Sequence, residues 1–314
     1  MNITLRQLKI FSAVAKHGSF TRAAEELHLT QPAVSMQVKQ LEEQSGMALF
    51  EQFGKKIFLT EAGEEVRRYG RAVTQQLDEM ESALNSLKGL ESGRLRLSIV
   101  ATANYFAPKL LGAFCARYRG VNVSLDVNNR RALLNQLKEN EVDMAIMGRA
   151  PADMELEAER FMENPLVIIA PPDHPLAGAA AIPLKRLEEE VFVMRESGSG
   201  TRKAMEEFFD QHGINIKTGM EVSSVEAIKQ SVQAGLGLGL MSRDAVRMEL
   251  SLGGLAILDV KRFPILRHWF LIHRKGKRLS APAAAFKEFV LKTTQSAGPA
   301  LPWRSAQTWP QGTQ

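Results

Sequence analysis

The segment that most constrains the amino-terminal fold reads Thr30-Gln31-Pro32-Ala33-Val34-Ser35-Met36-Gln37-Val38-Lys39-Gln40-Leu41-Glu42. Thr30 suits an N-cap, and Gln31 and Pro32 suit a first helical turn, where the missing amide hydrogen of proline costs nothing. Val34, Val38 and Leu41 follow at i, i+4 and i+7 and share one helix face. The segment therefore predicts a helix that buries one stripe and leaves a polar stripe free for a partner.

Two short helices precede this one, and a turn and strand follow it. Thr4 and Gln7 form a capping box for the first helix, which ends at Gly18. Ser19 caps the second helix, and residues 54–59 read as a turn and strand that suit a wing. Closely spaced helices with one exposed polar stripe are typical of a helix-turn-helix. We predict a winged helix-turn-helix over residues 1–61.

The polar groups at the start of the third helix are suited to DNA. A helix N-terminus favours phosphate, and nearby side chains can then reach base edges. An ordinary capped surface helix is the alternative, and residues 1–60 carry a charge of only +2, seven Lys and Arg against five Asp and Glu. The DNA prediction therefore depends on this helix together with the wing lysines and a dimer helix. The candidate DNA-binding residues are Thr21, Arg22, Thr30, Gln31, Pro32, Ser35, Met36, Gln37, Lys39, Lys55 and Lys56.

A long linker helix is predicted over residues 62–90. Its apolar residues are spaced by three or four, close to a heptad repeat. They are Val66, Tyr69, Val73, Leu77, Met80, Leu84 and Leu87. Because a solitary helix has nothing against which to bury such a stripe, we predict that it dimerises the chain.

From Arg94 the pattern changes to strands that alternate with helices, which indicates an α/β fold with parallel sheets. Two similar series of these elements predict an effector-binding domain over residues 94–295, made of two Rossmann-like subdomains with a cleft between them. Subdomain I covers 94–163 plus 268–295, and subdomain II covers 164–267. The tail, 296–314, is rich in Pro, Gly, Ser and Gln and is predicted to be disordered.

Several loops of this region are candidates for an anion site. The segment 197–202, Ser-Gly-Ser-Gly-Thr-Arg, joins a strand to a helix, so its amides can surround an anion while Arg202 adds a fork of donors. An ordinary glycine-rich turn is the alternative. Ligands in open α/β sheets lie at the carboxyl ends of strands, so we expect the corresponding loops to face one cleft. The candidate effector-binding residues are Thr102, Ala103, Asn104, Asn129, Arg149, Ser197, Ser199, Thr201, Arg202 and Ser224.

Composition and motifs argue against other classes of protein. The chain has 314 residues and a net charge of +5, and its single cysteine excludes an intramolecular disulfide or multi-thiolate metal site. Its six histidines show no metal-binding spacing, and residues 235–240, Gly-Leu-Gly-Leu-Gly-Leu, do not match the Rossmann fingerprint. We predict no enzyme, metal or cofactor. Without a visible signal peptide or membrane span, we expect a cytoplasmic protein with no membrane partner.

Residues 1 to about 90 closely resemble the LysR-type transcriptional regulators, and the resemblance extends to about residue 295. It is carried by Leu5-Arg6-Gln7-Leu8, Phe11, Gly18-Ser19-Phe20, Ala23-Ala24, Leu27, Thr30 to Ser35, Leu41-Glu42, Leu49-Phe50 and Leu59-Thr60-Glu61-Ala62-Gly63. Finer features resemble the Calvin-cycle regulators that activate RuBisCO operons. These are Gln31 to Glu42, Tyr105-Phe106-Ala107-Pro108-Lys109-Leu110-Leu111, Met147-Gly148-Arg149 and Gly198 to Arg202.

The resemblance implies an effector module similar to a periplasmic binding protein. It also implies that the chain forms homotetramers, which bind an interrupted palindrome in double-stranded DNA, and that RNA polymerase is a further partner of the protein. It implies that Gln31, Pro32, Ser35, Met36 and Gln37 meet the major groove. Lys55 and Met36 stand where relatives often have arginine, so base preference is not carried over. The implied effector is a small phosphorylated metabolite or NADPH. A LysR-type regulator of another anion-linked pathway, such as nitrogen or sulfur assimilation, is the alternative.

Overall fold

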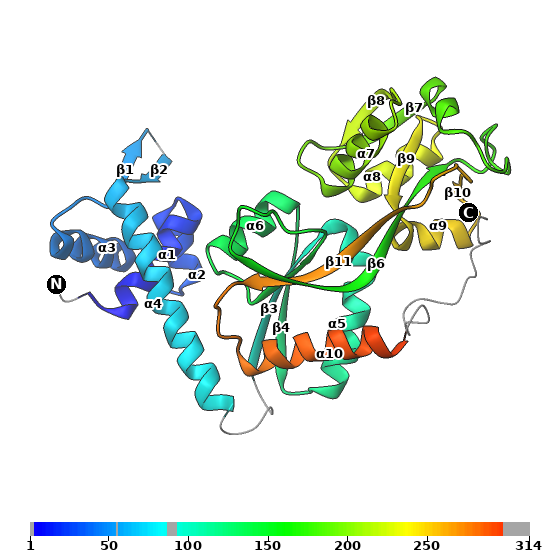
Figure 1. Cartoon of the computed structure of the whole chain (residues 1–314). Helices are drawn as coiled ribbons and strands as arrows, with labels where there is room; N and C mark the ends of the chain where they lie inside the picture. Colours follow the sequence, from blue (N-terminus) through cyan, green and yellow to red (C-terminus); the bar gives the residue numbers. More distant parts are fainter. Residues whose placement is uncertain (1–2, 55, 87–92, 298–314) are drawn as a thin grey trace. The chain divides into compact units, whose positions relative to one another are not determined.

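The computed structural model describes residues 3–54, 56–86 and 93–297. The chain divides into two compact units, Met1–Leu87 and Lys88–Gln314 (Figure 1). Each unit has its own hydrophobic core.

The first unit is a winged helix-turn-helix followed by a long helix, as predicted. It contains α1 (Leu5–His17), α2 (Phe20–Glu26), α3 (Gln31–Ser45), the antiparallel hairpin of β1 (Phe50–Phe53) and β2 (Lys56–Leu59), and α4 (Glu61–Ser86). The predicted capping box of α1 is confirmed, since Gln7 N donates to Thr4 Oγ1 and Thr4 N donates to Gln7 Oε1. The buried stripe of α3, Val34, Val38 and Leu41, packs into the core between the helices.

Thr30 lies at the N-cap of α3 as predicted, but the expected side-chain cap is wrong. Its backbone is extended and its carbonyl accepts a hydrogen bond from Val34 N at 3.1 Å, whereas its hydroxyl makes no capping hydrogen bond. Pro32 explains the difference in part, because it removes one of the two amide donors that an N-cap side chain normally accepts.

The second unit is built on one mixed sheet. In the described part of the chain its strand order is β4-β3-β5-β11-β6-β9-β7-β8, with the short strand β10 (Ala256–Ile257) paired to β6. The strands at the two ends of this order belong to two subdomains, and β6 and β11 run through both.

Subdomain I contains the parallel strands β3 (Gly93–Val100), β4 (Val121–Asn128) and β5 (Met144–Met147). Helices α5 (Ala107–Arg117) and α10 (Ala281–Ala297) bury one face of these strands, and α6 (Arg130–Lys138) buries the other. The short 3-10 helix η1 (Ala101–Tyr105) continues directly from β3.

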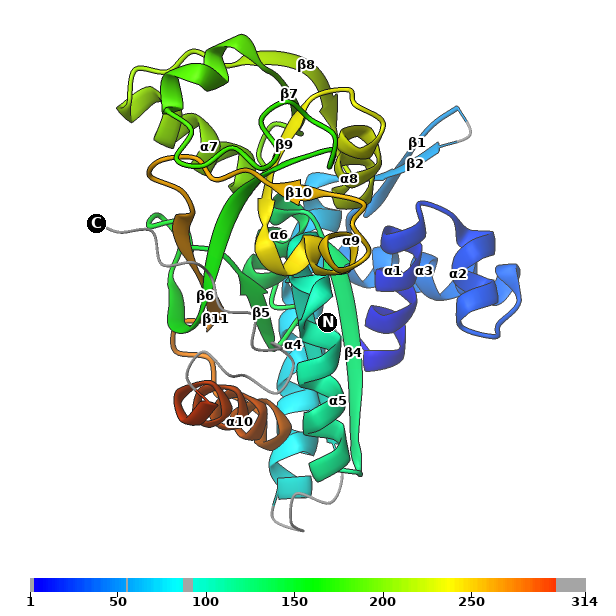
Figure 2. The same cartoon turned by 90° about the vertical axis from the view of Figure 1, so that its right-hand side faces the viewer.

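Subdomain II repeats this plan with the parallel strands β7 (Val191–Arg195), β8 (Lys217–Val222) and β9 (Leu238–Ser242). Helices α7 (Gly200–Gln211) and α8 (Val225–Gln233) cover opposite faces of these strands (Figure 2). Accordingly, the successive residues Phe192 and Val193 of β7 pack toward α7 and α8, respectively. The 3-10 helices η2 (Leu184–Glu189) and η3 (Arg243–Val246) and the short helix α9 (Arg247–Ser251) complete it.

The strands β6 (Leu156–Ala170) and β11 (Ile265–Arg274) correct the expectation of wholly parallel sheets. They pair antiparallel along ten residues of β11, and each also pairs antiparallel with a neighbour, β5 or β9. The pairing register shifts between Trp269 and Phe270. The predicted subdomain boundaries, 163/164 and 267/268, fall inside these two strands, which therefore form the connection between the subdomains.

Three further observations concern the predicted tail, the glycine-rich run and the length of the helices. Helix α10 extends to Ala297 and so contains the first two residues of the predicted disordered tail, 296–314; the rest of that tail lies outside the described residues. Of the glycine-rich run at 235–240, the part from Leu238 is strand β9. Among the described helices, none is long and apolar enough to cross a membrane.

Candidate DNA interface and effector site

Most of the candidate DNA-binding residues that the structure describes are exposed on the first unit. Thr21 and Arg22 are exposed on α2, and Lys56 is exposed on β2. At the start of α3 and along it, Thr30, Gln31, Pro32, Ser35, Met36 and Lys39 are exposed. Gln37 is half-buried and donates a hydrogen bond to Gln40 Oε1 at 3.2 Å. Lys55 lies outside the described residues. An exposed polar helix face beside a β-hairpin can enter a DNA groove without rearrangement of the core.

Hydrogen bonds fix the wing relative to α3 and α4. Glu42 Oε1 accepts hydrogen bonds from Leu49 N at 2.8 Å and Phe50 N at 3.3 Å. Thr60 Oγ1 donates to Ala48 O at 2.7 Å and accepts from Gly63 N at 3.0 Å. The wing is therefore held at both of its ends.

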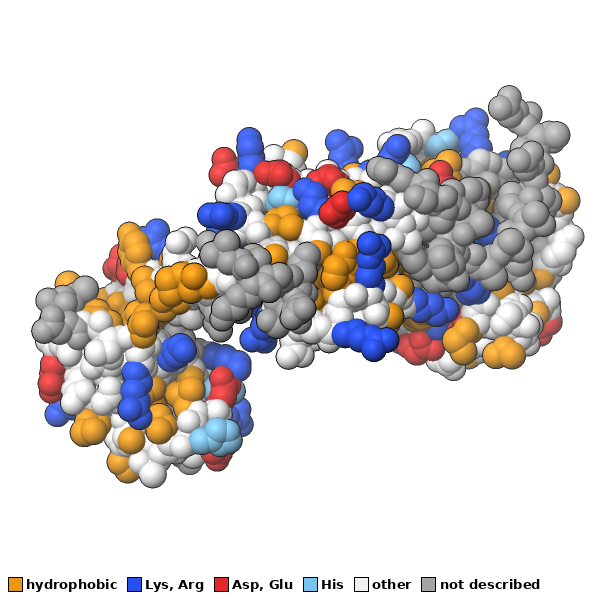
Figure 3. Space-filling model, turned by 90° about the horizontal axis from the view of Figure 1, so that it is seen from below, with side chains coloured by type: hydrophobic (Ala, Val, Ile, Leu, Met, Phe, Trp, Pro, Cys, Tyr) orange, Lys and Arg blue, Asp and Glu red, His pale blue; other side chains and the backbone are white. Residues whose placement is uncertain are grey.

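The apolar stripe of α4 is exposed over much of its length. Tyr69, Val73, Met80 and Leu84 have exposed fractions of 63%, 43%, 55% and 53%, whereas Val66 packs against the helix-turn-helix core. Figure 3 shows hydrophobic side chains on the surface of this unit. Leu77 is partly exposed, and Leu87 lies outside the described residues. An exposed stripe at heptad spacing supports the prediction of a dimer helix.

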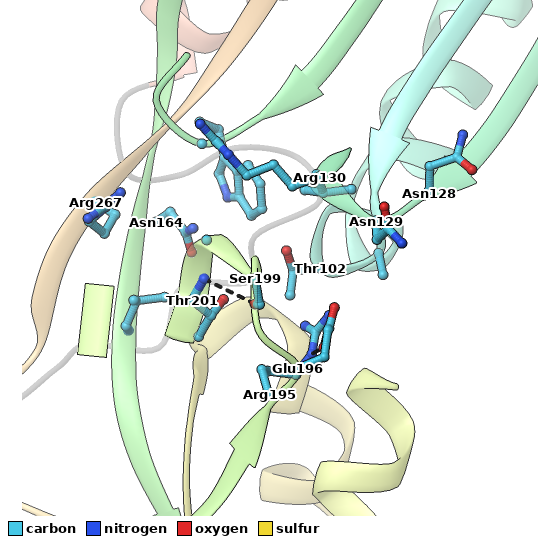
Figure 4. Close-up of a pocket in the computed structure, with 16 residues that line it drawn as sticks. Thr102, Asn128, Asn129, Arg130, Asn164, Arg195, Glu196, Ser199, Thr201 and Arg267 are labelled. Carbon is cyan, nitrogen blue, oxygen red and sulfur yellow. Dashed lines mark hydrogen bonds and ion pairs between the residues drawn. The ribbon is translucent and has the colours of Figure 1, made fainter. Parts of the chain in front are cut away.

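The effector unit contains a pocket where the two subdomains meet over β6 and β11. A cavity of about 60 Å³ is lined from subdomain I by η1, the start of α6 and the end of β5, and from subdomain II by the loop that opens α7 (Figure 4). A wider groove of about 1110 Å³ adjoins it and shares Arg130, Ser199, Gly200 and Arg267 with it. The carboxyl ends of β3, β4 and β7 therefore face one space, as the loop positions predict.

The predicted effector residues fall into three groups. Thr102, Asn129, Ser199 and Thr201 line the cavity. Arg149, Ser197 and Arg202 line only the wider groove. Ala103, Asn104 and Ser224 line neither: Ala103 is buried in the core of subdomain I, Asn104 is exposed, and Ser224 caps α8 by accepting a hydrogen bond from Ala227 N.

Arg202 has protein partners that compete with the predicted role. Its Nε donates to Glu206 at 2.7 Å, and its Nη1 donates to Glu221 and to the carbonyl of Arg195 at 3.0 Å. These hydrogen bonds raise the pKa of Arg202 and lower the pKa of Glu221. Arg202 therefore has a structural role: it connects the start of α7 to β7 and β8 through Arg195 and Glu221.

Three other arginines line the cavity, and sequence reasoning did not select them as site residues. Arg130 follows Asn129 at the start of α6, Arg195 ends β7, and Arg267 lies on β11. Their positions explain the omission. Arg130 and Arg195 adjoin the predicted loops at strand ends, and this position could have identified them as site residues. Arg267 lies inside a strand, where no local sequence pattern marks a site residue.

The cavity carries an excess of positive charge. Arg195 is buried and is neutralised by a bidentate ion pair with Glu196, at 2.6 and 2.7 Å. Arg130 has no carboxylate partner among the described residues; its Nη2 donates to Arg149 O at 2.8 Å. Burial, and then the nearby guanidinium of Arg267, lower the pKa of Arg130. Like charges that are held together in a partly buried site favour an anionic ligand.

A second polar cluster, whose residues do not line the cavity, joins the subdomains. The buried ammonium of Lys229 on α8 lies 2.7 Å from Glu249 and 2.9 Å from Glu226, and 4.8 Å from the ring centre of Tyr105 on η1. The Tyr105 hydroxyl donates to Glu226 at 3.1 Å. Because η1 also supplies Thr102 to the cavity, a ligand that contacts η1 is linked to subdomain II through this cluster.

The described residues form no group of three or more His, Cys, Asp and Glu side chains suited to a metal ion.

A winged helix-turn-helix joined to a two-subdomain unit with an anion-attracting cavity defines a ligand-responsive DNA-binding regulator. The family model "Bacterial regulatory helix-turn-helix protein, lysR family" matches residues 5–64, and the model "LysR substrate binding domain" matches residues 88–295. The chain belongs to the LysR family of transcriptional regulators. It is 56% identical to a RuBisCO operon transcriptional regulator of Allochromatium vinosum, over 93% of this chain and 96% of that protein.

Two solved structures are informative. The regulatory domain of CcmR from Synechocystis PCC6803, solved in complex with 2-PG, is 40% identical with a TM-score of 0.63, and the match covers 65% of this chain and 98% of that domain. Full-length CbnR complexed with its target DNA is 21% identical with a TM-score of 0.70, covering 92% of this chain and 99% of that one. At that identity the likeness to CbnR establishes the fold alone.

Proposed function

We propose that the protein activates carbon-fixation genes, the RuBisCO and Calvin-cycle operons, in response to a small phosphorylated acid bound in the cavity. The observation that carries this proposal is the cavity's charge: three guanidinium groups and one carboxylate line it, and one further carboxylate, Glu207 of the adjoining groove, lies 3.8 Å from Arg267. The likeness to a RuBisCO operon regulator supports the gene target, and the 2-PG complex of the CcmR domain supports 2-phosphoglycolate as a ligand of this class.

The cavity offers both neutral and charged donors to such a ligand. The hydroxyls of Ser199 and Thr201 lie at the start of α7, where free amides and the helix dipole favour a phosphoryl group, and Thr102 lines the cavity from η1. Arg130 and Arg267 supply positive charge from the opposite wall. In the wider groove, Arg149 is exposed and adds charge near the entrance.

The DNA-binding unit would read an interrupted palindrome. In this proposal Gln31, Pro32, Ser35, Met36 and Gln37 meet the major groove, since all but the half-buried Gln37 are exposed on α3. Methionine offers no bidentate donors, so Met36 would pack against a thymine methyl. The wing lysines would contact the backbone or the minor groove.

Ligand binding would act through the assembly. Dimers form through the exposed stripe of α4, and two dimers form a tetramer on the promoter. Binding in the cavity closes the two subdomains over β6 and β11, which changes the angle between dimers and relaxes the DNA bend. RNA polymerase then gains access to the promoter.

Isothermal titration calorimetry on the full chain tests which chemical class of effector the protein binds. We expect 2-phosphoglycolate to bind, and glycolate and inorganic phosphate to bind at least tenfold more weakly, because each supplies only part of the ligand. Sulfate and a nitrogen-containing acid such as glutamine serve as competitors. Binding of one of these instead of any phosphorylated acid would contradict the proposal and favour a regulator of sulfur or nitrogen assimilation.

A further inference from the structure

Asn164 occupies the floor of the cavity, at the point where β6 passes from one subdomain to the other. It pairs in register with Arg267 of β11, and both residues line the cavity. Asn164 is only 7% exposed. Figure 4 shows its amide projecting toward the space that Thr102, Ser199 and Thr201 also face. The residue is therefore buried in the protein yet directed at the ligand site.

The side-chain carbonyl of Asn164 has no hydrogen-bond partner in the described part of the chain. The indole Nε1 of Trp269, which also lines the cavity, likewise has no partner in the described part of the chain, whereas two other lining groups are paired. Asn129 Oδ1 accepts from Ala132 N at 2.9 Å, and Ser199 Oγ accepts from Thr201 N at 3.3 Å. Since buried polar atoms are almost always paired, an unpaired acceptor in a ligand cavity indicates a hydrogen bond that the ligand completes.

The chemistry of Oδ1 restricts what that ligand group is. An amide oxygen accepts a hydrogen bond and repels an anionic oxygen, so it does not complement a phosphoryl or carboxylate group. The arginines and hydroxyls around it serve those anionic groups. A neutral donor attached to the same small ligand, such as an alcohol hydroxyl, matches Asn164 Oδ1.

We propose that Asn164 is a specificity residue that accepts a hydrogen bond from a hydroxyl of the ligand, so that a phosphorylated hydroxy acid binds more tightly than 2-phosphoglycolate, which lacks a free hydroxyl. This inference rests on the proposed function, because it takes a phosphorylated acid in the cavity as given. A site that hydrogen-bonds a ligand hydroxyl favours the hydroxylated ligand over an analogue that lacks it, because the analogue leaves the protein group unpaired.

A pair of ligands that differ by one hydroxyl tests the assignment. Isothermal titration of the full chain compares 3-phosphoglycerate with 3-phosphonooxypropanoate, which lacks the 2-hydroxyl. The wild-type chain should prefer the hydroxylated ligand by about tenfold or more, the affinity equivalent of one hydrogen bond. In Asn164→Leu this preference should fall to near one. Asn122→Leu, on an exposed position of β4 outside the cavity, is the matched control and should keep it.

The outcomes separate the two proposals. Binding of both ligands without discrimination by the wild-type chain overturns the assignment of Asn164 and leaves the phosphorylated-acid proposal standing. An equal loss for both ligands in Asn164→Leu also overturns the assignment, since the amide then serves a group that the ligands share. If no phosphorylated acid binds, including 2-phosphoglycolate, the proposed function fails as well. Asn164→Ala, which adds no apolar bulk, replaces the leucine variant if thermal unfolding shows that variant to be misfolded.

Discussion

Replacing Arg130 with glutamine should weaken effector binding and leave the fold intact. Arg130 lines both the cavity and the wider groove, and within the described residues its hydrogen-bond partner is the carbonyl of Arg149. Burial, and then the charge of Arg267, lower the pKa of Arg130, and Arg267 itself lies 3.8 Å from Glu207, so Arg130 is the guanidinium of the two that has no carboxylate partner among the described residues. Removing Arg130 therefore costs the ligand a partner without leaving a buried carboxylate unpaired.

The size of the effect follows from the type of contact. A hydrogen bond to a charged group contributes about 1.5–3 kcal/mol, which corresponds to a roughly 10- to 150-fold loss of affinity at about 1.4 kcal/mol per tenfold. Isothermal titration with 2-phosphoglycolate measures it. The matched control is Arg131→Gln, the next residue on α6, which is exposed and outside both the cavity and the groove.

The variant Arg202→Gln distinguishes a ligand-binding role of Arg202 from a purely structural one. Since Arg202 is held by Glu206, Glu221 and the carbonyl of Arg195, we expect a smaller loss of affinity than for Arg130 and a lower unfolding temperature. Affinity that is unchanged in Arg130→Gln but lost in Arg202→Gln would refute this reasoning and restore Arg202 as the anion contact that the sequence predicts.

Three further predictions concern stability and assembly. Gly63→Ala places a Cβ 2.1 Å from the carbonyl oxygen of Leu49, so it should destabilise the DNA-binding unit by about 1–3 kcal/mol in thermal unfolding, with weaker DNA binding. Lys229→Met leaves Glu249 without its buried cation and should cost about 3–5 kcal/mol in urea unfolding. Burial alone would lower the pKa of Lys229, but hydrogen bonds to its carboxylate partners raise it above the value in the unfolded chain. The stabilisation by these ion pairs is therefore complete below about pH 10.4, and it is lost as the pH rises through the pKa of Lys229 in the folded protein. Val73→Asp, on the exposed stripe of α4, should give a smaller species in light scattering, and an unchanged mass would contradict the dimer helix.

Local signals in the sequence were enough to predict the first unit. The capping box of Thr4 and Gln7 and the spacing of Val34, Val38 and Leu41 are short-range patterns, and the structure contains both. The hydroxyl of Thr30 departs from prediction because proline at the second helical position removes an amide donor.

The effector unit was predictable only in part. Loops at the ends of parallel strands follow a general rule, and Thr102, Asn129, Ser199 and Thr201 indeed line one cavity. The floor of that cavity depends on the antiparallel pairing of β6 with β11, which joins residues about 100 positions apart in the chain. Asn164 and Arg267 face each other only through this pairing, so no local pattern reveals them.

A DNase I footprint tests the central claim, that a phosphorylated acid in the effector cavity changes how the protein holds its promoter. The full chain would be bound to DNA upstream of a RuBisCO operon from the source organism, with 2-phosphoglycolate or with inorganic phosphate as the control. We predict an extended protected region that shortens with 2-phosphoglycolate and does not change with phosphate. Protection of the same length under both conditions, at ligand concentrations that saturate the cavity, would contradict the account.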